Sequence, residues 1–296
     1  MRGQIISSSC GVFKILTDNG TYEGKARGTL KNKFGRLYVG DFVEFNEKES
    51  VIENVEPRKS FLKRPPISNI DQIVIILSYV KPEFSYELVF KYLTYANMNG
   101  IKAMLVVTKV DLCENKDELK EIKEVFETLN VNTYFVSNKS REGLGEVNGI
   151  FKGKISCLMG QSGVGKSSLL NAINDSYKRN VGEYSKALGR GKHETKEVVL
   201  LPFEGGYIAD TPGFSSLELD LYKEDLAQFF PGFDDYNKCF FSNCLHVTEK
   251  KCAIKEKVEL GLIPKKAYDT YLILSNNLLP KNQRYSKWKL LYPQVY

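Results

Sequence analysis

The sequence lacks any long apolar run. The longest ones, such as residues 73–77 and 104–107, are far shorter than the roughly 20 apolar residues that a membrane-spanning helix needs. The N-terminal stretch MRGQIISSSCGVFK lacks the apolar core of a secretory signal. Internal repeats and low-complexity tracts are also absent. We therefore exclude the class of membrane proteins and expect a cytoplasmic protein.

Histidine is scarce, and cysteine is unevenly distributed. The chain has 2 histidines, His193 and His246, and 6 cysteines, of which half lie close to His246. In a cytoplasmic chain, clustered cysteines favour a metal site over disulfides. We expect the scattered ones to be small buried hydrophobic residues: Cys10, Cys113 and Cys157.

Acidic residues are in a slight minority, and the positive excess lies at the two ends of the chain. The sequence has 42 Lys and Arg against 36 Asp and Glu, a net charge of +6. Residues 1–66 carry +4 and the last 20 residues another +4. Basic flanks fit a polyanionic partner, although solvated surface lysines explain them equally well. Candidates for contact with RNA are Arg27, Lys31, Lys33, Arg36, Arg58, Lys59, Arg64, Tyr285 and Trp288.

Two changes of pattern predict three domains. Residues 1–63 contain short β-branched and aromatic segments, one of them Arg36–Val39, separated by Gly, Asn and Asp, which predicts a small β-barrel such as the OB-fold. Residues 64–220 alternate apolar runs with helical stretches, which predicts a mostly parallel α/β sheet. Residues 221–296 are predicted to be helical and irregular. In the middle domain we predict strands at 72–77, 102–108, 133–137, 154–159, 197–203 and 207–209, and helices at 86–97, at 116–129 and from 166.

A phosphate-binding loop is predicted between one of these strands and a helix. The segment GQSGVGKS fits G-x-x-x-x-G-K-[ST]. The glycines let backbone N–H groups surround phosphate oxygens. Lys166 is expected to neutralise the β and γ phosphates, and the Ser167 hydroxyl to bind Mg²⁺ at the helix N-terminus. The predicted phosphate-binding residues are Gly160, Gln161, Ser162, Gly163, Val164, Gly165, Lys166, Ser167 and Ser168.

Two later segments suit the γ-phosphate and the Mg²⁺ ion. Asp210 ends a predicted strand and can reach Mg²⁺ through water, while the N–H of Gly213 can contact the γ-phosphate. Between the phosphate loop and Asp210 lies LGRGKHETK, which is too polar and glycine-rich to form a core. We predict a mobile loop in which Thr195 closes on Mg²⁺ and His193 meets the nucleotide. A plain flexible loop is the alternative.

Guanine recognition is predicted from two loops at strand ends. The first is Thr108-Lys109-Val110-Asp111, in which the Asp111 carboxylate can accept hydrogen bonds from N1–H and N2–H of guanine, a pair of donors that adenine lacks. The Lys109 stem can cover one face of the base. Thr108 stands where this motif usually has Asn, so one amide contact is lost. The second loop is Ser137-Asn138-Lys139, whose backbone N–H can reach guanine O6.

The order of these motifs is unusual. Both base loops precede the phosphate loop in the chain, whereas most GTPases have the phosphate loop first. The site requires only that the strand ends meet in space, wherever the chain is cut. We therefore predict a circular permutation of a P-loop GTPase, joined through Gly143–Gly153.

A structural zinc site is predicted after residue 221. The spacing Cys239-x4-Cys244-x-His246-x5-Cys252 supplies three thiolates and one imidazole. Four protein ligands complete a tetrahedral Zn²⁺ shell and leave no position for a reactive water. A loop of uncoordinated thiols is the alternative.

Taken together, these motifs resemble the RsgA (YjeQ) family, the circularly permuted GTPases that depend on the small ribosomal subunit. The resemblance runs nearly end to end and rests on TKVD, GQSGVGKSS, LGRGKHET, DTPGF and the Cys/His spacing. It implies an N-terminal OB domain, a permuted GTPase domain and a zinc-bearing helical domain. It also implies binding to the 30S subunit and its 16S rRNA during late maturation, with hydrolysis of GTP stimulated by the subunit. We expect a monomer that uses one zinc ion and Mg²⁺.

The chain departs from the family pattern at a few positions. Thr108 replaces Asn, Glu194 stands where Thr is common, and Lys250-Lys251 replaces a pair that contains Pro. Phe214 follows DTPG where many GTPases have a Gln that orients water, so slow intrinsic hydrolysis is expected, with His193 or a ribosomal group positioning the water. Three other interpretations remain open: an ATPase, an RNA-binding module without catalysis, and a permuted GTPase that acts on the large subunit.

Overall fold

The computed structural model describes residues 1–28, 30, 34–175, 177, 198–210 and 217–281. Three predicted catalytic residues, His193, Thr195 and Gly213, lie outside the described residues, as do Tyr285 and Trp288. The chain forms two units: residues 1–82, 99–112 and 134–216 make the first, and residues 83–98, 113–133 and 217–296 the second. None of the described helices is both long enough and apolar enough to span a membrane.

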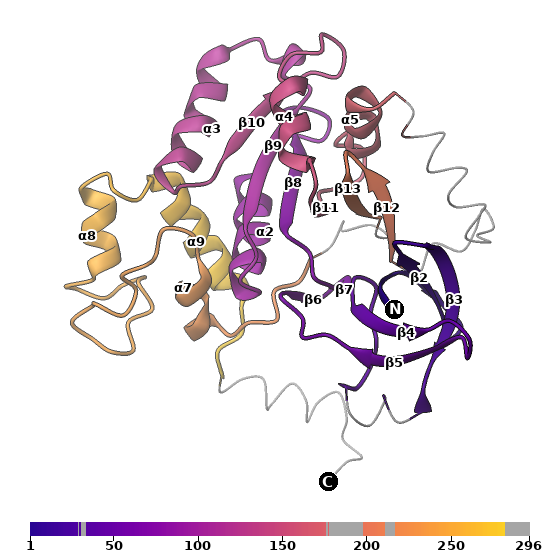
Figure 1. The fold of residues 1–296 in the computed structure, drawn as a ribbon. Helices are drawn as coiled ribbons and strands as arrows, with labels where there is room; N and C mark the ends of the chain where they lie inside the picture. The colour runs from indigo at the N-terminus through magenta and orange to yellow at the C-terminus, as the bar shows by residue number, and fades with distance from the viewer. Residues whose placement is uncertain (29, 31–33, 176, 178–197, 211–216, 282–296) are drawn as a thin grey trace, which may run out of the picture. The chain divides into compact units, whose positions relative to one another are not determined.

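The first unit begins with a closed five-stranded barrel (Figure 1). Pairing runs in the order β1-β2-β3-β5-β4, and β4 returns to β1. This circuit is that of an OB-like barrel, as predicted. Alternate side chains, among them Ile5, Ile15 and Phe45, fill the interior. The strands are β1 (Arg2–Ser9), β2 (Val12–Thr17), β3 (Gly20–Ala26), β4 (Phe42–Asn46) and β5 (Val51–Val55).

Two predictions in this region are wrong. Segment 36–39 is not a strand, since Val39 alone forms a bridge, with Ile67 of the following hairpin β6 (Phe61–Lys63) and β7 (Pro66–Ser68). Cys10 is exposed, because it lies in the β1–β2 turn with a φ of +48°. Of the three scattered cysteines, only Cys157 is fully buried, on a central strand.

A mostly parallel sheet follows the barrel in the same unit. Its order is β10-β9-β8-β11-β13-β12, with β8 parallel to β9 and β11, β11 parallel to β13, and β12 antiparallel to β13. Every residue of β8 is buried, which explains its unbroken apolar sequence. The strands are β8 (Gln72–Ser78), β9 (Ala103–Thr108), β10 (Thr133–Val136), β11 (Ile155–Met159), β12 (Val199–Phe203) and β13 (Gly206–Asp210).

Helices α4 (Leu144–Phe151) and α5 (Lys166–Ile173) pack with this sheet around one hydrophobic core. Phe151, Leu158 and Leu169 are among its members. Helix α4 occupies the segment that was predicted to join the permuted halves. It begins after Gly143, whose φ is +72°, and a Cβ there would lie 2.1 Å from the carbonyl oxygen of Phe135. Glycine is therefore required at the start of the junction.

The second unit combines two helices from the middle of the chain with the C-terminal region. Helix α2 (Tyr86–Met98) packs against α7 (Leu226–Phe229) and α9 (Lys265–Asn277). The rings of Phe90 and Phe230 stack at 5.1 Å, and Asn97 donates a hydrogen bond to Phe229 O at 3.0 Å. The remaining elements are α3 (Lys116–Thr128), α8 (Ala253–Glu259) and the short turns η1 (Val110–Leu112, in the first unit) and η2 (Lys223–Asp225). The predicted domain ranges put α2 and α3 with the sheet, and those ranges stay a prediction.

Candidate nucleotide site and metal centre

The predicted phosphate loop connects β11 to α5. Gly160 has a φ of +153°, and a Cβ on it would lie 2.1 Å from the carbonyl oxygen of Ile76 on the adjacent strand. The loop thus leaves the sheet where only glycine fits. Val164 is fully buried and anchors the loop in the core, while Ser162 and Ser167 are exposed. The loop therefore presents backbone and hydroxyl groups outward from a fixed base.

Lys166 curls over this loop. Its Nζ donates hydrogen bonds to the carbonyl oxygens of Gly160 at 2.7 Å and Gln161 at 2.8 Å. Burial lowers the pKa of Lys166. Because a partly desolvated ammonium gains more from an anion than a hydrated one does, this position suits a phosphate group.

The magnesium ligands predicted from sequence are only partly described. Ser167 is exposed in the first turn of α5. Asp210 is the last residue of β13, which runs parallel to β11, so the backbone at Asp210 lies at the strand ends that also carry the phosphate loop. Both positions therefore lie at the edge of the sheet where the sequence predicts the Mg²⁺ site. The third predicted ligand, Thr195, lies outside the described residues.

The first base loop is bonded to the phosphate loop by two side chains. Thr108 is fully buried at the end of β9, and its hydroxyl donates to the carbonyl oxygen of Val164 at 2.5 Å and lies 3.3 Å from that of Leu77. Lys109, with a φ of +61°, donates from Nζ to the carbonyl oxygen of Gly163 at 2.9 Å. The Thr at position 108 therefore still joins the base loop to the phosphate loop. Val110 is buried, whereas Asp111 is exposed and open to a base.

The second base loop reaches the same place. Ser137 is fully buried, and its Oγ accepts hydrogen bonds from the backbone N–H of Lys139 at 3.2 Å and of Ser140 at 3.0 Å. A Cβ placed on Gly165 would lie 3.7 Å from Asn138 Nδ2 and 3.7 Å from Thr108 Oγ1. The buried Oδ1 of Asn138 has no hydrogen-bond partner among the described residues. Three motifs far apart in sequence thus meet around Gly165.

One participant was not predicted from the sequence. The loop after β8 lies beside the phosphate loop, since a Cβ on Gly163 would lie 3.9 Å from Pro82 Cδ. The carbonyl oxygen of Lys81 accepts a hydrogen bond from Lys109 Nζ, and that of Pro82 accepts one from Ser78 Oγ at 2.7 Å. Backbone carbonyls act here, so no side-chain motif marks this loop.

The cysteine and histidine cluster has the spacing of a tetrahedral zinc site. A zinc ion with Zn–S of about 2.3 Å and Zn–N of about 2.0 Å places S–S pairs about 3.8 Å and S–N pairs about 3.5 Å apart. The structure has 3.8 Å between the sulfurs of Cys239 and Cys252. It has 3.3 to 3.6 Å between His246 Nδ1 and the three sulfurs, including that of Cys244. All four donor atoms lie within 4.8 Å of one another, so the set is compatible with one shared Zn²⁺ ion.

Burial shifts the pKa values of three residues in this cluster. Burial raises the pKa of Cys244 to about 12 and raises that of Cys252, while burial lowers the pKa of His246. Without a cation, burial thus favours the protonated thiols of Cys244 and Cys252 and the neutral imidazole of His246. A bound divalent cation would stabilise the thiolates and would be coordinated by the imidazole nitrogen.

Residues around the ligands hold them in place, and no sequence signal marked these residues. The Glu249 carboxylate accepts hydrogen bonds from the backbone N–H of Leu245 at 2.8 Å and of Val247 at 2.9 Å. Tyr268 donates to the His246 carbonyl oxygen at 2.8 Å, and Tyr271 donates to that of Leu245 at 2.9 Å. Helix α9, which carries both tyrosines, therefore orients the ligand loop.

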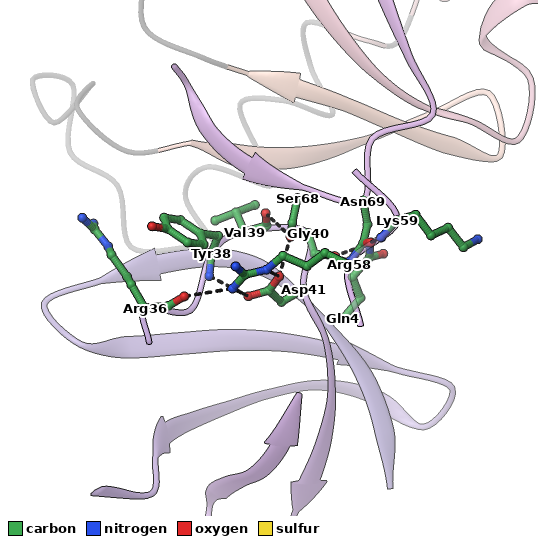
Figure 2. Close-up of polar contacts among 10 residues, drawn as sticks. All are labelled: Gln4, Arg36, Tyr38, Val39, Gly40, Asp41, Arg58, Lys59, Ser68 and Asn69. Carbon is green, nitrogen blue, oxygen red and sulfur yellow. Dashed lines mark hydrogen bonds and ion pairs between the residues drawn. The ribbon is translucent and has the colours of Figure 1, made fainter. Parts of the chain in front are cut away.

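On the barrel, the predicted RNA contact Arg58 pairs with a buried carboxylate (Figure 2). Asp41 is fully buried, and its carboxylate accepts hydrogen bonds from Arg58 Nε at 2.7 Å, Arg58 Nη2 at 2.9 Å, Ser68 Oγ at 2.6 Å and Tyr38 N at 2.9 Å. Arg58 also donates to the carbonyl oxygen of Arg36 at 2.9 Å and lies over the Tyr38 ring at 4.8 Å. These bonds to Asp41 raise the pKa of Arg58. Asp41 therefore connects the barrel to the β6–β7 hairpin through Ser68, and Arg58 neutralises its charge.

The other basic candidates differ in how far their charged groups already contact other residues of the chain. Arg27 pairs with Glu49 at 2.6 Å and lies 3.7 Å from Glu53. Lys59 and Arg36 are exposed, and Figure 2 shows both side chains extending away from the Asp41 network. Lys59 is the better candidate for contact with a phosphate backbone, because Arg36 also lies over the Tyr38 ring at 5.7 Å. Lys31 and Lys33 lie outside the described residues.

The order of the sheet, with the phosphate loop after β11 and the base loops after β9 and β10, defines a circularly permuted P-loop GTPase. A model of the RsgA GTPase domain matches residues 55–220, and a model of the RsgA N-terminal domain matches residues 2–52. The chain belongs to the RsgA GTPase family and is a GTP hydrolase.

Similar proteins cover nearly the whole chain. The small ribosomal subunit biogenesis GTPase RsgA of Caldanaerobacter subterraneus subsp. tengcongensis is 38% identical over 96% of this chain and 98% of its own. The crystal structure of YjeQ from Thermotoga maritima has a TM-score of 0.79 at 36% identity, with 94% of this chain and 98% of that one covered. That of YloQ, described as a circularly permuted GTPase, has a TM-score of 0.75 at 34% identity, with 93% and 94% covered.

Proposed function

We propose that this GTPase acts in the biogenesis of the small ribosomal subunit. It binds the 30S subunit and its 16S rRNA during late assembly, and hydrolyses GTP to GDP and phosphate faster when bound. The observation that carries this proposal is the similarity to proteins named for that role. Their similarity extends over nearly the whole of this chain, so each of its predicted domains has a counterpart in them. The convergence of both base loops on the phosphate loop supports a working nucleotide site in this chain.

In this proposal, different residues of the chain bind the phosphates, the base and the Mg²⁺ ion of the nucleotide. The N–H groups of the phosphate loop and the Lys166 ammonium bind the β and γ phosphates. The exposed Asp111 carboxylate selects guanine, and the Lys109 stem covers the base, fixed by its bond to Gly163. Ser167, Thr195 and Asp210 hold the Mg²⁺ ion, which neutralises charge on the phosphates when bound.

The hydrolytic step is assigned to residues after the phosphate loop. Phe214 cannot orient a water molecule, so we propose that His193 or a ribosomal group does so once the subunit is bound. Thr195 is proposed to respond to the γ-phosphate through the Mg²⁺ ion, and the N–H of Gly213 is proposed to contact it directly. Equal stimulated rates for His193→Ala and the parent would remove His193 from this step.

The remaining assignments follow from the family and the cluster geometry. Cys239, Cys244, His246 and Cys252 hold one structural zinc ion, which stabilises the C-terminal region. We further propose a monomer that works in the cytoplasm, with an RNA-binding barrel at residues 1–63, a GTPase domain at 64–220 and a zinc-binding domain at 221–296.

Hydrolysis of GTP measured with purified small subunits, with large subunits and with neither tests this function. Small subunits are expected to raise the rate by at least tenfold, and large subunits are not. Lys166→Ala, which removes the phosphate-binding cation, is expected to abolish the rate under all three conditions. Stimulation by large subunits alone would instead support the alternative of a large-subunit factor.

A further inference from the structure

Two phenylalanines stand out at the Cys/His cluster because they are exposed. Phe240 is 68% exposed and Phe241 is 46% exposed. They lie between the ligands Cys239 and Cys244, and their rings meet edge to face at 5.0 Å and 85°. We call this pair the aromatic tip. An apolar core does not hold the two rings, and the metal-ligand loop fixes their position.

The backbone of the aromatic tip is fixed at several points. Phe240 N donates to the carbonyl oxygen of Lys251 at 3.3 Å, and the carbonyl oxygen of Phe241 accepts from Cys244 N at 3.2 Å. The backbone that carries both rings is therefore held in place, and the edge-to-face contact places each ring against the other. A preorganised aromatic side chain loses little conformational freedom on binding, which favours its use as a contact.

Positive charge lies beside the aromatic tip. The Nζ of Lys251 lies 4.8 Å from the Phe240 ring centroid, and Lys250 beside it is exposed. The nearest acid in sequence, Glu249, is already bonded to backbone N–H groups. Another acid, Asp235, pairs with two other lysines at 2.5 and 2.6 Å. Within the described part of the chain, no carboxylate pairs with Lys250 or Lys251.

We propose that the aromatic tip binds unpaired RNA bases of the small ribosomal subunit. Phe240 and Phe241 stack on bases while Lys250 and Lys251 contact the adjacent phosphates. Stacking on an aromatic ring is tolerant of base sequence, and single-stranded RNA offers the base faces that a duplex hides. A protein partner fits less well, because exposed Ser242 interrupts the apolar surface and cations border it. This inference rests on the proposed function.

The first experiment measures binding of small subunits to the zinc-loaded full chain with a non-hydrolysable GTP analogue. Phe240→Ala with Phe241→Ala is expected to weaken binding by at least about thirtyfold, roughly fivefold or more for each of the two stacked bases, with the salt dependence unchanged. Lys250→Ala with Lys251→Ala is expected to flatten the salt dependence, by about 1.4 in log–log slope for two phosphates on single strands. The matched control is Leu260→Ala with Leu262→Ala, which removes apolar side chains that are 74% and 59% exposed in the same unit.

A second experiment identifies the partner directly. A benzophenone side chain placed at position 240 is expected to crosslink to material that ribonuclease digests. Crosslinking to ribosomal protein alone, or unchanged affinity in the double phenylalanine variant, overturns the inference while leaving the proposed function intact. If the parent protein itself does not bind small subunits, both fail. Zinc content and the unfolding midpoint, expected to equal those of the parent, separate a lost contact from a lost fold.

Discussion

Arg58 offers a test that separates a structural role from RNA binding. Its guanidinium supplies two of the four hydrogen bonds to the buried Asp41 carboxylate. In Arg58→Ala, the carboxylate stays buried with Ser68 and Tyr38 as its only donors. Removing one partner of a buried ion pair costs about 3–5 kcal/mol. Because the Arg58 side chain is 26% exposed, water can replace part of it, so we expect a loss near 3 kcal/mol in the free energy of unfolding.

The assay is urea unfolding followed by circular dichroism, and Lys59→Ala is the control. Lys59 is the neighbouring basic residue and is exposed, so its loss is expected to leave the unfolding midpoint unchanged and to weaken subunit binding modestly, with a shallower salt dependence. Arg58→Lys keeps the charge but not the two-pronged geometry, and is expected to recover only part of the stability. If Arg58→Ala unfolds at the parent's midpoint and binds RNA more weakly, Arg58 is an RNA contact and our reasoning fails.

Other expected outcomes concern the nucleotide site, the metal and a buried thiol. Thr108→Val is isosteric but leaves the Val164 carbonyl oxygen without its donor, so we expect about 1–2 kcal/mol less stability and weaker GDP binding by calorimetry; equal binding would contradict the bond. Asn138→Ala is expected to weaken GDP binding several-fold, because its amide has a buried Oδ1 without a partner among the described residues and an Nδ2 beside Gly165. An unchanged Kd would mean that only the backbone of Asn138 matters. Chelation of zinc is expected to lower the melting temperature of the protein and to expose helix α9 to protease. A protease pattern identical to that of the zinc-loaded protein would argue against a structural metal. Burial raises the pKa of Cys157 to about 12. At pH 8 a short iodoacetamide pulse is therefore expected to label exposed Cys10 and to spare Cys157 until the protein unfolds. Early labelling of both cysteines would show that the strand carrying Cys157 opens in the folded protein.

Local patterns predicted most of the sheet and the position of the phosphate loop. An unbroken apolar run at 72–77 indicated a strand buried on both faces, and β8 is such a strand. The phosphate loop was located by its glycines, since only glycine tolerates the approach of Gly160 to Ile76. These features depend on residues close together in sequence, so a single chain reveals them.

Features that depend on distant partners were missed. Residues 36–39 have strand-forming side chains, but Val39 alone among them forms a bridge, with Ile67 of β7, and the backbone N–H of Tyr38 instead donates to Asp41. The ion pair of Arg58 with Asp41 was not predicted, because the two residues lie 17 positions apart in sequence. The packing of α2 with α9 joins segments that are more than 160 residues apart, and no local pattern encodes it.

The division of the chain into two units has a practical consequence for dissecting the protein. The backbone passes from one unit to the other after residues 82, 98, 112, 133 and 216. A fragment that ends at residue 220 would keep α2 and remove α7 and α9, which leaves the buried ring of Phe90 without its stacking partner Phe230. Such a fragment is expected to aggregate whatever its nucleotide affinity. The contribution of the metal-binding region to GTP hydrolysis is therefore best measured with point substitutions in the intact chain. A truncation would measure only the effect of exposing the apolar face of helix α2.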